Sequence, residues 1–435
     1  MTFFSDLAKT LNYAGRNGLR ETMVAASERL RSRAGAHYVY RAPSDADLDL
    51  QRTAYRARRE AGEELPLISF LVPVYEPNLH YLEAMLRSCL DNTYQNFEIV
   101  VADASPEDAG EKLAESFSTD KISWHRLPKN LGISGNTNAA AEFARGDYVA
   151  LLDYDDLITQ DALFEITSVI SEFSPEIIYT DEDKCDEKAE KFFEPNHKPG
   201  FNVDYFFANN YICHLLVMKR ELFLALKLRS TYDGAQDYDL MLRAPWSEIR
   251  HVPKVLYHWR THQGSTAGNP GSKDYAYEAG LLALKEHFRS CRIDADVIHS
   301  RHRGFYDVTY QPDIFTARKE VGVVGGKLVD RNHRIVGGMM DEAGRVAFAG
   351  MHEMESGPMH RADTMQDVAA VDVRCMQIRD ELRPVYQAVF NASYETHIMK
   401  AGEDELRIMS LEFCRQARNM GYLIVWDPRM SRRME

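Results

Sequence analysis

Three aspartates follow the apolar run Val-Ala-Leu-Leu in the stretch LLDYDD: Asp153, Asp155 and Asp156. Clustered carboxylate oxygens suit a hard divalent cation such as Mg²⁺ or Mn²⁺, bound together with a diphosphate ligand. In an extended backbone Asp153 and Asp155 would point the same way and face one ligand. A cap on a helix beginning near Gln160 would explain Asp156 or Thr159, but not all three acids. The spacing therefore predicts a cation site.

Another carboxylate and two imidazoles occur further along the chain. Asp237 lies in GAQDYDLMLR, and His258 and His262 lie in YHWRTH. Asp237 suits either a general base or the cap of the helix that follows it. The histidines suit either a structural role or completion of the site begun by the aspartates. Arg260, between them, has a planar fork that suits phosphate.

The elements that would position these residues alternate along the chain from about residue 65 to 170. Strands are expected at LISFLVPVY, NFEIVVADAS, ISWHRLP and DYVALLDYDD, with helices at LHYLEAMLRSCL, PEDAGEKLAESF and NTNAAAEFARG. This alternation predicts an α/β fold with a parallel sheet and right-handed crossovers. Ligands of such sheets bind beyond the carboxyl ends of the strands. PVYEP, Asp103 and DYDD should therefore meet at one edge.

Composition narrows the class of protein. The chain has 435 residues and a formal net charge of −14, which argues against a nucleic-acid partner. Its six cysteines contain no Cys-x-x-Cys pair, as expected of reduced thiols. No apolar run reaches about 18 residues. We therefore expect a cytoplasmic protein, soluble or peripheral to the membrane.

Residues 11–33 are rich in arginine. Five arginines face only two glutamates in this segment: Arg16, Arg20, Arg29, Arg31 and Arg33, with Glu21 and Glu28. One interpretation is an amphipathic helix on the inner face of an anionic membrane. The other is a solvated helix packed on the next domain.

The order PVYEP, VVADAS, KNLGISGNTNAA and LLDYDD resembles the inverting family 2 glycosyltransferases of GT-A fold. More narrowly, IIYTDEDK, NYICHLLVMKREL, GAQDYDLMLR and PKVLYHWRTHQGSTA resemble bacterial O-antigen-type polysaccharide transferases. The resemblance covers residues 65 to about 290. It implies a GT-A fold, a nucleotide-diphospho-sugar donor, a divalent cation (Mn²⁺ or Mg²⁺) and inversion at the anomeric carbon.

The same resemblance implies a donor site. Asp103 would accept a hydrogen bond from the base, which favours a pyrimidine and hence UDP or dTDP. Asp155 would hold the metal, with His258 as the first and His262 as the second choice of a further ligand. The other donor-binding residues would be Pro73, Val74, Tyr75, Glu76, Asn130, Gly132, Asn136 and Asp153.

On the acceptor side, the resemblance implies that Asp237 is the catalytic base. Gln236 replaces a glutamate usual in the family, which puts a secondary acceptor contact in doubt. The acceptor would be a growing surface polysaccharide or a lipid-linked glycan. The sugar- and acceptor-binding residues would be Glu182, Asp183, Lys184, Asn210, His214 and Gln236. On sequence alone, DEDK at 181–184 also fits a solvated charge run after an apolar strand.

Three regions are expected: a helical region at 1–64, the GT-A domain at 65–300 and a smaller α/β module at 301–435. RDEL at 379–382 echoes KREL at 219–222, and MSLEFCRQARNMGYLIVW parallels QDYDLMLRAPWSEIRHV, with Ser410 in the place of Asp237. Because serine cannot act as a carboxylate base, the module reads as a truncated, inactive copy. Two other functions stay open for the whole chain: a glycan-binding scaffold and a nucleotidyltransferase.

Overall fold

The computed structural model describes residues 14–15, 18, 22–28, 38–262, 274–394 and 401–434. The chain divides into two compact units. We call residues 38–201 and 210–287 the N-terminal unit, and residues 202–209 and 288–434, with the described residues before 38, the C-terminal unit. The boundaries expected at 64 and 300 stay a prediction. The arginines of the segment 11–33, and residues 263–267 of the motif that ends in QGSTA, lie outside the described residues.

A nine-stranded sheet forms the core of the N-terminal unit, in the order β3-β2-β1-β4-β8-β6-β9-β5 with β7 paired to β6. Its first part is parallel, as expected: β1 (Ile68–Val74), β2 (Phe97–Asp103), β3 (Ile122–Arg126) and β4 (Tyr148–Leu151). Its second part is mixed: β5 (Leu157–Ile158), β6 (Ile177–Cys185), β7 (Phe192–Asn196), β8 (Leu216–Lys219) and β9 (Ile249–Arg260). Strands β1 and β2 are buried almost throughout, because helices cover them.

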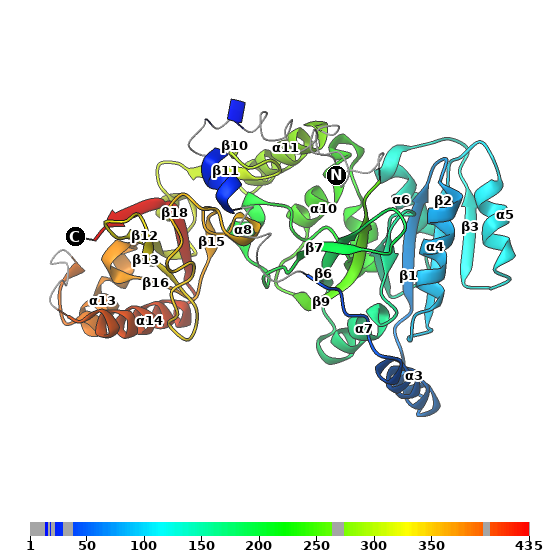
Figure 1. Ribbon diagram of the computed structural model, residues 1–435, viewed down its shortest axis with the longest axis horizontal. Coiled ribbons are helices and arrows are strands. Elements are labelled where there is room, and N and C mark those ends of the chain that lie inside the picture. Colours follow the sequence, from blue (N-terminus) through cyan, green and yellow to red (C-terminus); the bar gives the residue numbers. More distant parts are fainter. Residues whose placement is uncertain are drawn as a thin grey trace. The chain divides into compact units, whose positions relative to one another are not determined.

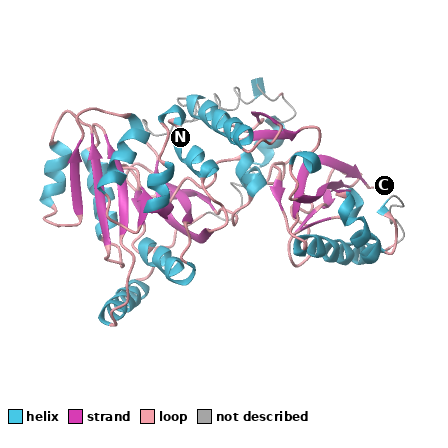
Figure 2. Ribbon diagram, turned by 180° about the vertical axis from the view of Figure 1, so that it is seen from behind, coloured by secondary structure: helices cyan, strands magenta, loops and turns pink. Residues whose placement is uncertain are grey.

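The helices of this unit lie beside the strands (Figures 1 and 2). The sequence predicted α4 (Leu79–Leu90), α5 (Ala109–Ser116) and α6 (Gly132–Phe143), and all three are present. The predicted apolar face of α4 is buried at Leu82, Met85, Leu86 and Cys89. The remaining helices are α3 (Asp45–Glu60), α7 (Ala162–Phe173), α9 (Arg220–Leu226), the 3₁₀ turn η1 (Ser230–Tyr232), α10 (Gln236–Arg243) and α11 (Asp274–Ser290). None of the described helices is both long and apolar enough to cross a membrane.

Two local expectations were wrong. Strand β4 ends at Leu151, so Asp153 and Asp155 lie in a turn and not in extended backbone. Helix α7 has Asp161 at its N-cap and receives no side-chain cap, so neither Asp156 nor Thr159 caps it. The aspartates of this turn are therefore not used to cap α7.

The C-terminal unit is built on a five-stranded sheet in the order β13-β12-β18-β15, with β17 paired to β12. These strands are β12 (Val321–Val329), β13 (Ile335–Gly337), β15 (Gln366–Asp367), β17 (Met376–Ile378) and β18 (Leu423–Arg433). Two further strand pairs join β10 (Ala295–His299) to β11 (Tyr306–Tyr310), and β14 (Met339–Met340) to β16 (Ala370–Val371). The helical segments are α8 (Val203–Ala208), α12 (Ile314–Ala317), η3 (Pro358–His360), η4 (Val373–Cys375), η5 (Asp380–Leu382), α13 (Arg383–Phe390) and α14 (Glu403–Asn419).

The two sheets share a strand pattern. In the N-terminal unit β6 runs parallel to β9 and antiparallel to β8 and β7. In the C-terminal unit β12 runs parallel to β18 and antiparallel to β17 and β13. The register also slips partway along both parallel pairs, between Thr180 and Glu182 in one and between Gly325 and Lys327 in the other. The shared pattern is compatible with the internal sequence repeat, and the interpretation of the C-terminal part as a truncated copy stays a prediction.

Candidate functional site

The turn after β4 and the end of β9 meet through the DYDD aspartates. His262 Nε2 lies 2.8 Å from Asp155 Oδ2. The Asp156 carboxylate accepts hydrogen bonds from the Tyr257 hydroxyl and, at 2.8 Å, from the backbone N–H of Arg260. Two segments about a hundred residues apart in sequence are therefore joined by acidic side chains.

A second set of possible metal ligands lies in the same region. Carboxylate oxygens of Asp153 and Asp156 and a ring nitrogen of His214 lie within 4.8 Å of one another. Burial raises the pKa of Asp156 well above its usual range, and the charges of Asp155 and Asp153 raise it further. A divalent cation would relieve that repulsion, and the two carboxylates suit Mn²⁺ or Mg²⁺. The imidazole of His214 would suit Mn²⁺ better than Mg²⁺, whose preferred ligands are oxygens. These donors fit the cation implied by the resemblance.

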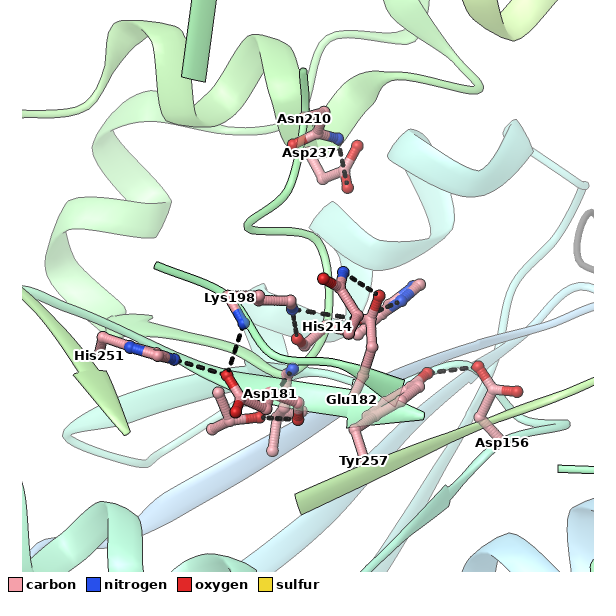
Figure 3. Close-up of polar contacts among 12 residues, drawn as sticks. Asp156, Asp181, Glu182, Lys198, Asn210, His214, Asp237, His251 and Tyr257 are labelled. Carbon is pink, nitrogen blue, oxygen red and sulfur yellow. Dashed lines mark hydrogen bonds and ion pairs between the residues drawn. The ribbon is translucent and has the colours of Figure 1, made fainter. Parts of the chain in front are cut away.

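The acids of DEDK belong to β6 itself and are buried, so the interpretation as a solvated charge run is wrong. Glu182 accepts hydrogen bonds from Lys198 Nζ at 3.1 Å, His214 Nδ1 at 3.2 Å and Asn196 Nδ2 at 3.1 Å (Figure 3). Burial alone would raise the pKa of Glu182, but the charges of Lys198 and His214 outweigh it and lower the pKa to about 2. Glu182 is thus held as a carboxylate.

The partners of Glu182 are fixed in turn. The Lys198 side chain is fully buried, and its Nζ also donates to the backbone oxygen of His214. The His214 ring stacks on Tyr257, with ring centroids 4.8 Å apart. Burial alone would lower the pKa of His214, but Cys213 and Glu182 together hold it well above the usual range. The chain Glu182–His214–Tyr257–Asp156 connects β6 to the DYDD turn.

The neighbouring acids have histidine partners of their own. Asp183 Oδ1 lies 2.5 Å from His258 Nδ1, and its Oδ2 accepts from the Tyr38 hydroxyl at 2.7 Å. Asp181 lies 2.7 Å from His251 Nε2 (Figure 3). Of the two candidate histidines, His262 contacts Asp155, whereas His258 is buried against Asp183. Their role as metal ligands stays a prediction.

Lys184 and Arg260 are also committed to protein partners. Lys184 Nζ lies 2.7 Å from Glu194 Oε2. Arg260 is buried, and its guanidinium donates to the backbone oxygens of Asp155 at 2.6 Å and Glu187 at 2.7 Å. In this arrangement Arg260 braces the turn, while its Nη2 is buried and has no hydrogen-bond partner among the described residues.

Asp237 lies in the first turn of α10, whose N-cap is Ala235, so it is not the helix cap. Its Oδ2 accepts from Asn210 Nδ2 at 3.1 Å, and its Oδ1 accepts from the backbone N–H of Tyr238 at 2.9 Å. In Figure 3 this pair lies apart from the Glu182 group. Gln236 accepts from Gly234 N–H at 2.8 Å and so shapes the turn before α10.

The residues expected to bind the nucleotide lie at the ends of β1 and β2 and at the start of α6. Asp103 is buried, and its carboxylate accepts from Ser105 N–H at 2.8 Å, Arg126 Nη1 at 3.2 Å and Trp124 Nε1 at 3.3 Å. Pro73 and Val74 pair with β2, with Val74 opposite Asp103. Tyr75 and Glu76 follow, and the Tyr75 side chain is 46% exposed. The sheet therefore brings PVYE and Asp103 to one edge, as predicted.

The loop before α6 is held by its own side chains. Asn130 Oδ1 accepts from Gly132 N–H at 2.9 Å and from Asn136 Nδ2 at 3.1 Å. Gly132 has a φ of +76°, and a Cβ there would lie 2.7 Å from an Asp233 carboxylate oxygen. Only glycine fits this position without displacing Asp233. Ser134 also donates to Asp233, which links this loop to the segment before Asp237.

Sequence reasoning missed three residues of this network: Lys198, Asn196 and Tyr257. Tyr257 stands within the YHWRTH motif, where the histidines and the arginine drew attention. Lys198 and Asn196 lie in the segment at 192–200, whose β7 pairs with β6 across Glu182 and Asn196. That pairing carries no local sequence signal, so only the fold reveals it.

Comparison with known proteins gives one family match, the model Glycosyl transferase family 2, over residues 69–226. Uncharacterized protein y4gI of Sinorhizobium fredii is 39% identical over 231 residues, covering 51% of this chain and 25% of that protein. O-antigen biosynthesis protein RfbC of Myxococcus xanthus is 32% identical over 231 residues, covering 51% and 18%. This chain thus spans a quarter or less of the length of both relatives.

Among solved structures, S. aureus TarS and its fragment 1–349 in complex with UDP-GlcNAc are each 18% identical with a TM-score of 0.40. Each covers 50% of this chain, and the match takes in 39% and 65% of their own chains. The family match confirms the resemblance to family 2 glycosyltransferases over residues 69–226. Together with the observed strand–helix order, it confirms the predicted α/β fold of the N-terminal unit.

Proposed function

We propose that this chain, which carries a family 2 glycosyltransferase domain over residues 69–226, is a metal-dependent inverting transferase. It moves a sugar from a UDP-sugar or dTDP-sugar to a hydroxyl of a growing bacterial surface polysaccharide or lipid-linked glycan, and the nucleoside diphosphate departs. The observation that carries the proposal is the convergence of Asp153, Asp156 and His214 within 4.8 Å, at the carboxyl end of the parallel strands. The similarity to RfbC supports a polysaccharide acceptor.

Sugar transfer with inversion needs a base on the acceptor side and neutralisation on the donor side. Asp237 takes the proton from the attacking hydroxyl, and Asn210 orients its carboxylate through the 3.1 Å hydrogen bond. A Mn²⁺ or Mg²⁺ bound at the DYDD turn supplies charge neutralisation for the departing diphosphate. Asp153, Asp155 and Asp156, with His214 and His262, are the residues that would hold it.

The edge formed by β1 and β2 is the proposed nucleotide site. Pro73, Val74, Tyr75 and Glu76 line the base and ribose, and Asp103 meets the base. Because the Asp103 oxygens already accept from Ser105, Trp124 and Arg126, the base adds to an existing network. The proposed sugar and acceptor residues are Glu182, Asp183, Lys184, Asn210 and Gln236. His214, also expected among them, is assigned here to the cation because it lies near Asp153 and Asp156.

For residues 301–435 we propose an inactive transferase-like module. Ser410, which the repeat aligns with Asp237, is buried in α14. Its hydroxyl donates to the Leu406 oxygen at 2.7 Å and accepts from Val373 N–H at 3.0 Å. A side chain so committed to the backbone holds the helix in place and offers no base.

A donor screen tests the proposal. The full chain is incubated with Mn²⁺ or Mg²⁺, a panel of nucleotide sugars and an extract of lipid-linked glycans, and released nucleoside diphosphate is measured. Release that requires both metal and acceptor supports the proposal and names the donor. Glycan binding without release from any donor would favour the scaffold function, and release of pyrophosphate would favour a nucleotidyltransferase.

A further inference from the structure

A separate polar cluster lies within the C-terminal unit. Ligand-capable atoms of His302, His360 and Asp363 lie within 4.8 Å of one another. His302 lies in the loop between β10 and β11, whereas His360 ends η3 and Asp363 follows it. The two imidazole rings stack with centroids 3.8 Å apart. Two separate segments thus bring three side chains that can bind a metal close together.

The carboxylate of Asp363 is fixed on one side and unused on the other. Its Oδ2 accepts from both guanidinium nitrogens of Arg301 that face it, Nε at 2.9 Å and Nη2, and lies 2.7 Å from His302 Nε2. Arg301 Nε also lies 3.2 Å from His302 Nε2. The other carboxylate oxygen of Asp363, Oδ1, is buried and has no hydrogen-bond partner among the described residues. The Asp363 side chain is only 10% exposed, so an unpaired carboxylate oxygen there is costly.

The backbone around the cluster is well anchored. His360 N–H donates to Gly357 O at 3.1 Å, and Thr364 Oγ1 donates to His360 O at 2.7 Å. Arg301, by holding Oδ2, leaves Oδ1 oriented for another partner, as the outer hydrogen bonds of metal-bound carboxylates do. Lys327, a further cation near Asp363 besides Arg301 and Arg429, donates its Nζ to Glu353 O at 2.9 Å. The orientation of Asp363 does not depend on Lys327.

A small cavity adjoins the same carboxylate. It has a volume of about 20 Å³, and Asp363 lines it together with Asp307, Tyr306, Tyr310 and Arg429. A cavity of about 10–15 Å³ is already large enough to hold one water molecule. His302 and His360 are not among the residues that line this cavity, so the cluster itself supplies three ligands, two imidazoles and one carboxylate. With a solvent molecule as the fourth ligand, this set suits Zn²⁺. Mg²⁺ and Ca²⁺ prefer oxygen ligands only.

We propose that His302, His360 and Asp363 form a binding site for a zinc-class transition-metal cation within the C-terminal unit. The cation binds Asp363 Oδ1, the oxygen without a hydrogen-bond partner among the described residues, while Arg301 keeps its hydrogen bonds to Oδ2. It links the β10–β11 loop to the segment after η3. The site is independent of the sugar-transfer proposal, because it uses no residue of the N-terminal unit.

The test is zinc titration of the full chain after chelator treatment, in excess Mg²⁺ so that the DYDD turn is saturated. Calorimetry gives the stoichiometry, and Co²⁺ substitution gives a visible spectrum typical of imidazole ligands in tetrahedral geometry. Asp155→Asn serves as a variant of the other candidate metal site. His352→Ala is the matched control, since His352 stacks on His333 in the same unit and lies outside the cluster.

Wild type, Asp155→Asn and His352→Ala should each bind one zinc ion that Mg²⁺ does not displace. His360→Ala and Asp363→Asn should bind it at least about 100-fold more weakly and lose the Co²⁺ spectrum, since loss of a ligand exceeds the effect of an outer partner. Circular dichroism of the metal-free variants checks that each is folded. Equal zinc binding by both variants and wild type, or no zinc binding by wild type, would overturn the proposal.

Discussion

His262 Nε2 lies 2.8 Å from Asp155 Oδ2, and this contact closes the end of β9 onto the turn after β4. The Asp155 and His262 side chains are 20% and 17% exposed, so both reach the surface of the site. His258, four residues earlier, is buried against Asp183. One histidine of the YHWRTH motif is therefore placed to bind a ligand, and the other is placed to support the sheet.

The two histidines should accordingly fail in different ways when replaced. His262→Ala should raise the Mn²⁺ concentration needed for half-maximal sugar transfer by about 10- to 100-fold, with thermal stability near that of wild type. His258→Ala should instead destabilise the fold by about 2–3 kcal/mol, because it leaves the buried Asp183 carboxylate with Tyr38 alone. Metal titrations and urea unfolding of both variants provide the measurement. If His258→Ala raised the required Mn²⁺ concentration and His262→Ala instead destabilised the fold, His258 would be the metal ligand.

Asp156 gives a pH prediction. Its pKa is raised well above the usual range by burial and by Asp155 and Asp153, so the folded chain favours the protonated acid. The resulting stability is full below the ordinary pKa of 3.8 and is lost as pH rises through the raised value. Metal-free protein should thus become less stable as the pH rises from 3.8 through the raised pKa of Asp156. Mn²⁺ should restore the lost stability.

Asp156→Asn should remove that dependence. An amide accepts from Arg260 N–H and donates to the Tyr257 oxygen, so both hydrogen bonds survive. The metal-free variant should unfold at a higher temperature than wild type at neutral pH, yet respond less to Mn²⁺. Calorimetric scans from acid to neutral pH, with Asp155→Asn as the control, measure both effects. A lower unfolding temperature for Asp156→Asn would mean that the carboxylate is stabilised by its surroundings.

Lys198 and Glu182 form a buried pair, and removing one partner should cost more than removing both. Lys198→Met leaves the Glu182 carboxylate short of its main positive partner and should destabilise the protein by about 3 kcal/mol. Glu182→Gln with Lys198→Met should recover much of that loss. Urea unfolding of the single and double variants gives the coupling, and additive effects would show that the two side chains do not interact.

The same pair predicts an acid limb of stability. The pKa of Glu182 is lowered to about 2, so its contribution is present above the ordinary value of 4.5 and is lost as pH falls toward 2. Glu182→Gln should flatten this part of the stability curve. The assignment would be contradicted if Glu182→Gln lost stability as steeply as wild type when the pH falls from 4.5 to about 2.

The fold of the N-terminal unit was largely predictable, because apolar strands alternate with helices from β1 to β4 and each strand ends in polar residues. The acid-rich β6 was harder, since IIYTDEDK has a hydrophilic second half that looks like a surface turn. Burial of Asp181, Glu182 and Asp183 depends on His251, Lys198 and His258, which come from distant segments. Sequence spacing identified the DYDD acids, but only the strand pairing of β5 with β9 decides which histidine reaches them.

Asn210 should act on the reaction through Asp237. Asn210→Ala removes the 3.1 Å hydrogen bond that orients the carboxylate and should lower kcat about tenfold with little change in KM for the donor. A change in KM alone would show that Asn210 contacts substrate and does not position the base.

The most direct test of the account is the rate of sugar transfer by Asp237→Asn, measured with the donor found in the screen, saturating Mn²⁺ and acceptor. The amide preserves the size of the side chain but cannot take a proton. We predict a fall in kcat of about 10²- to 10⁴-fold with donor binding and thermal stability unchanged. Transfer at the wild-type rate by this variant would contradict the assignment of Asp237 as the base.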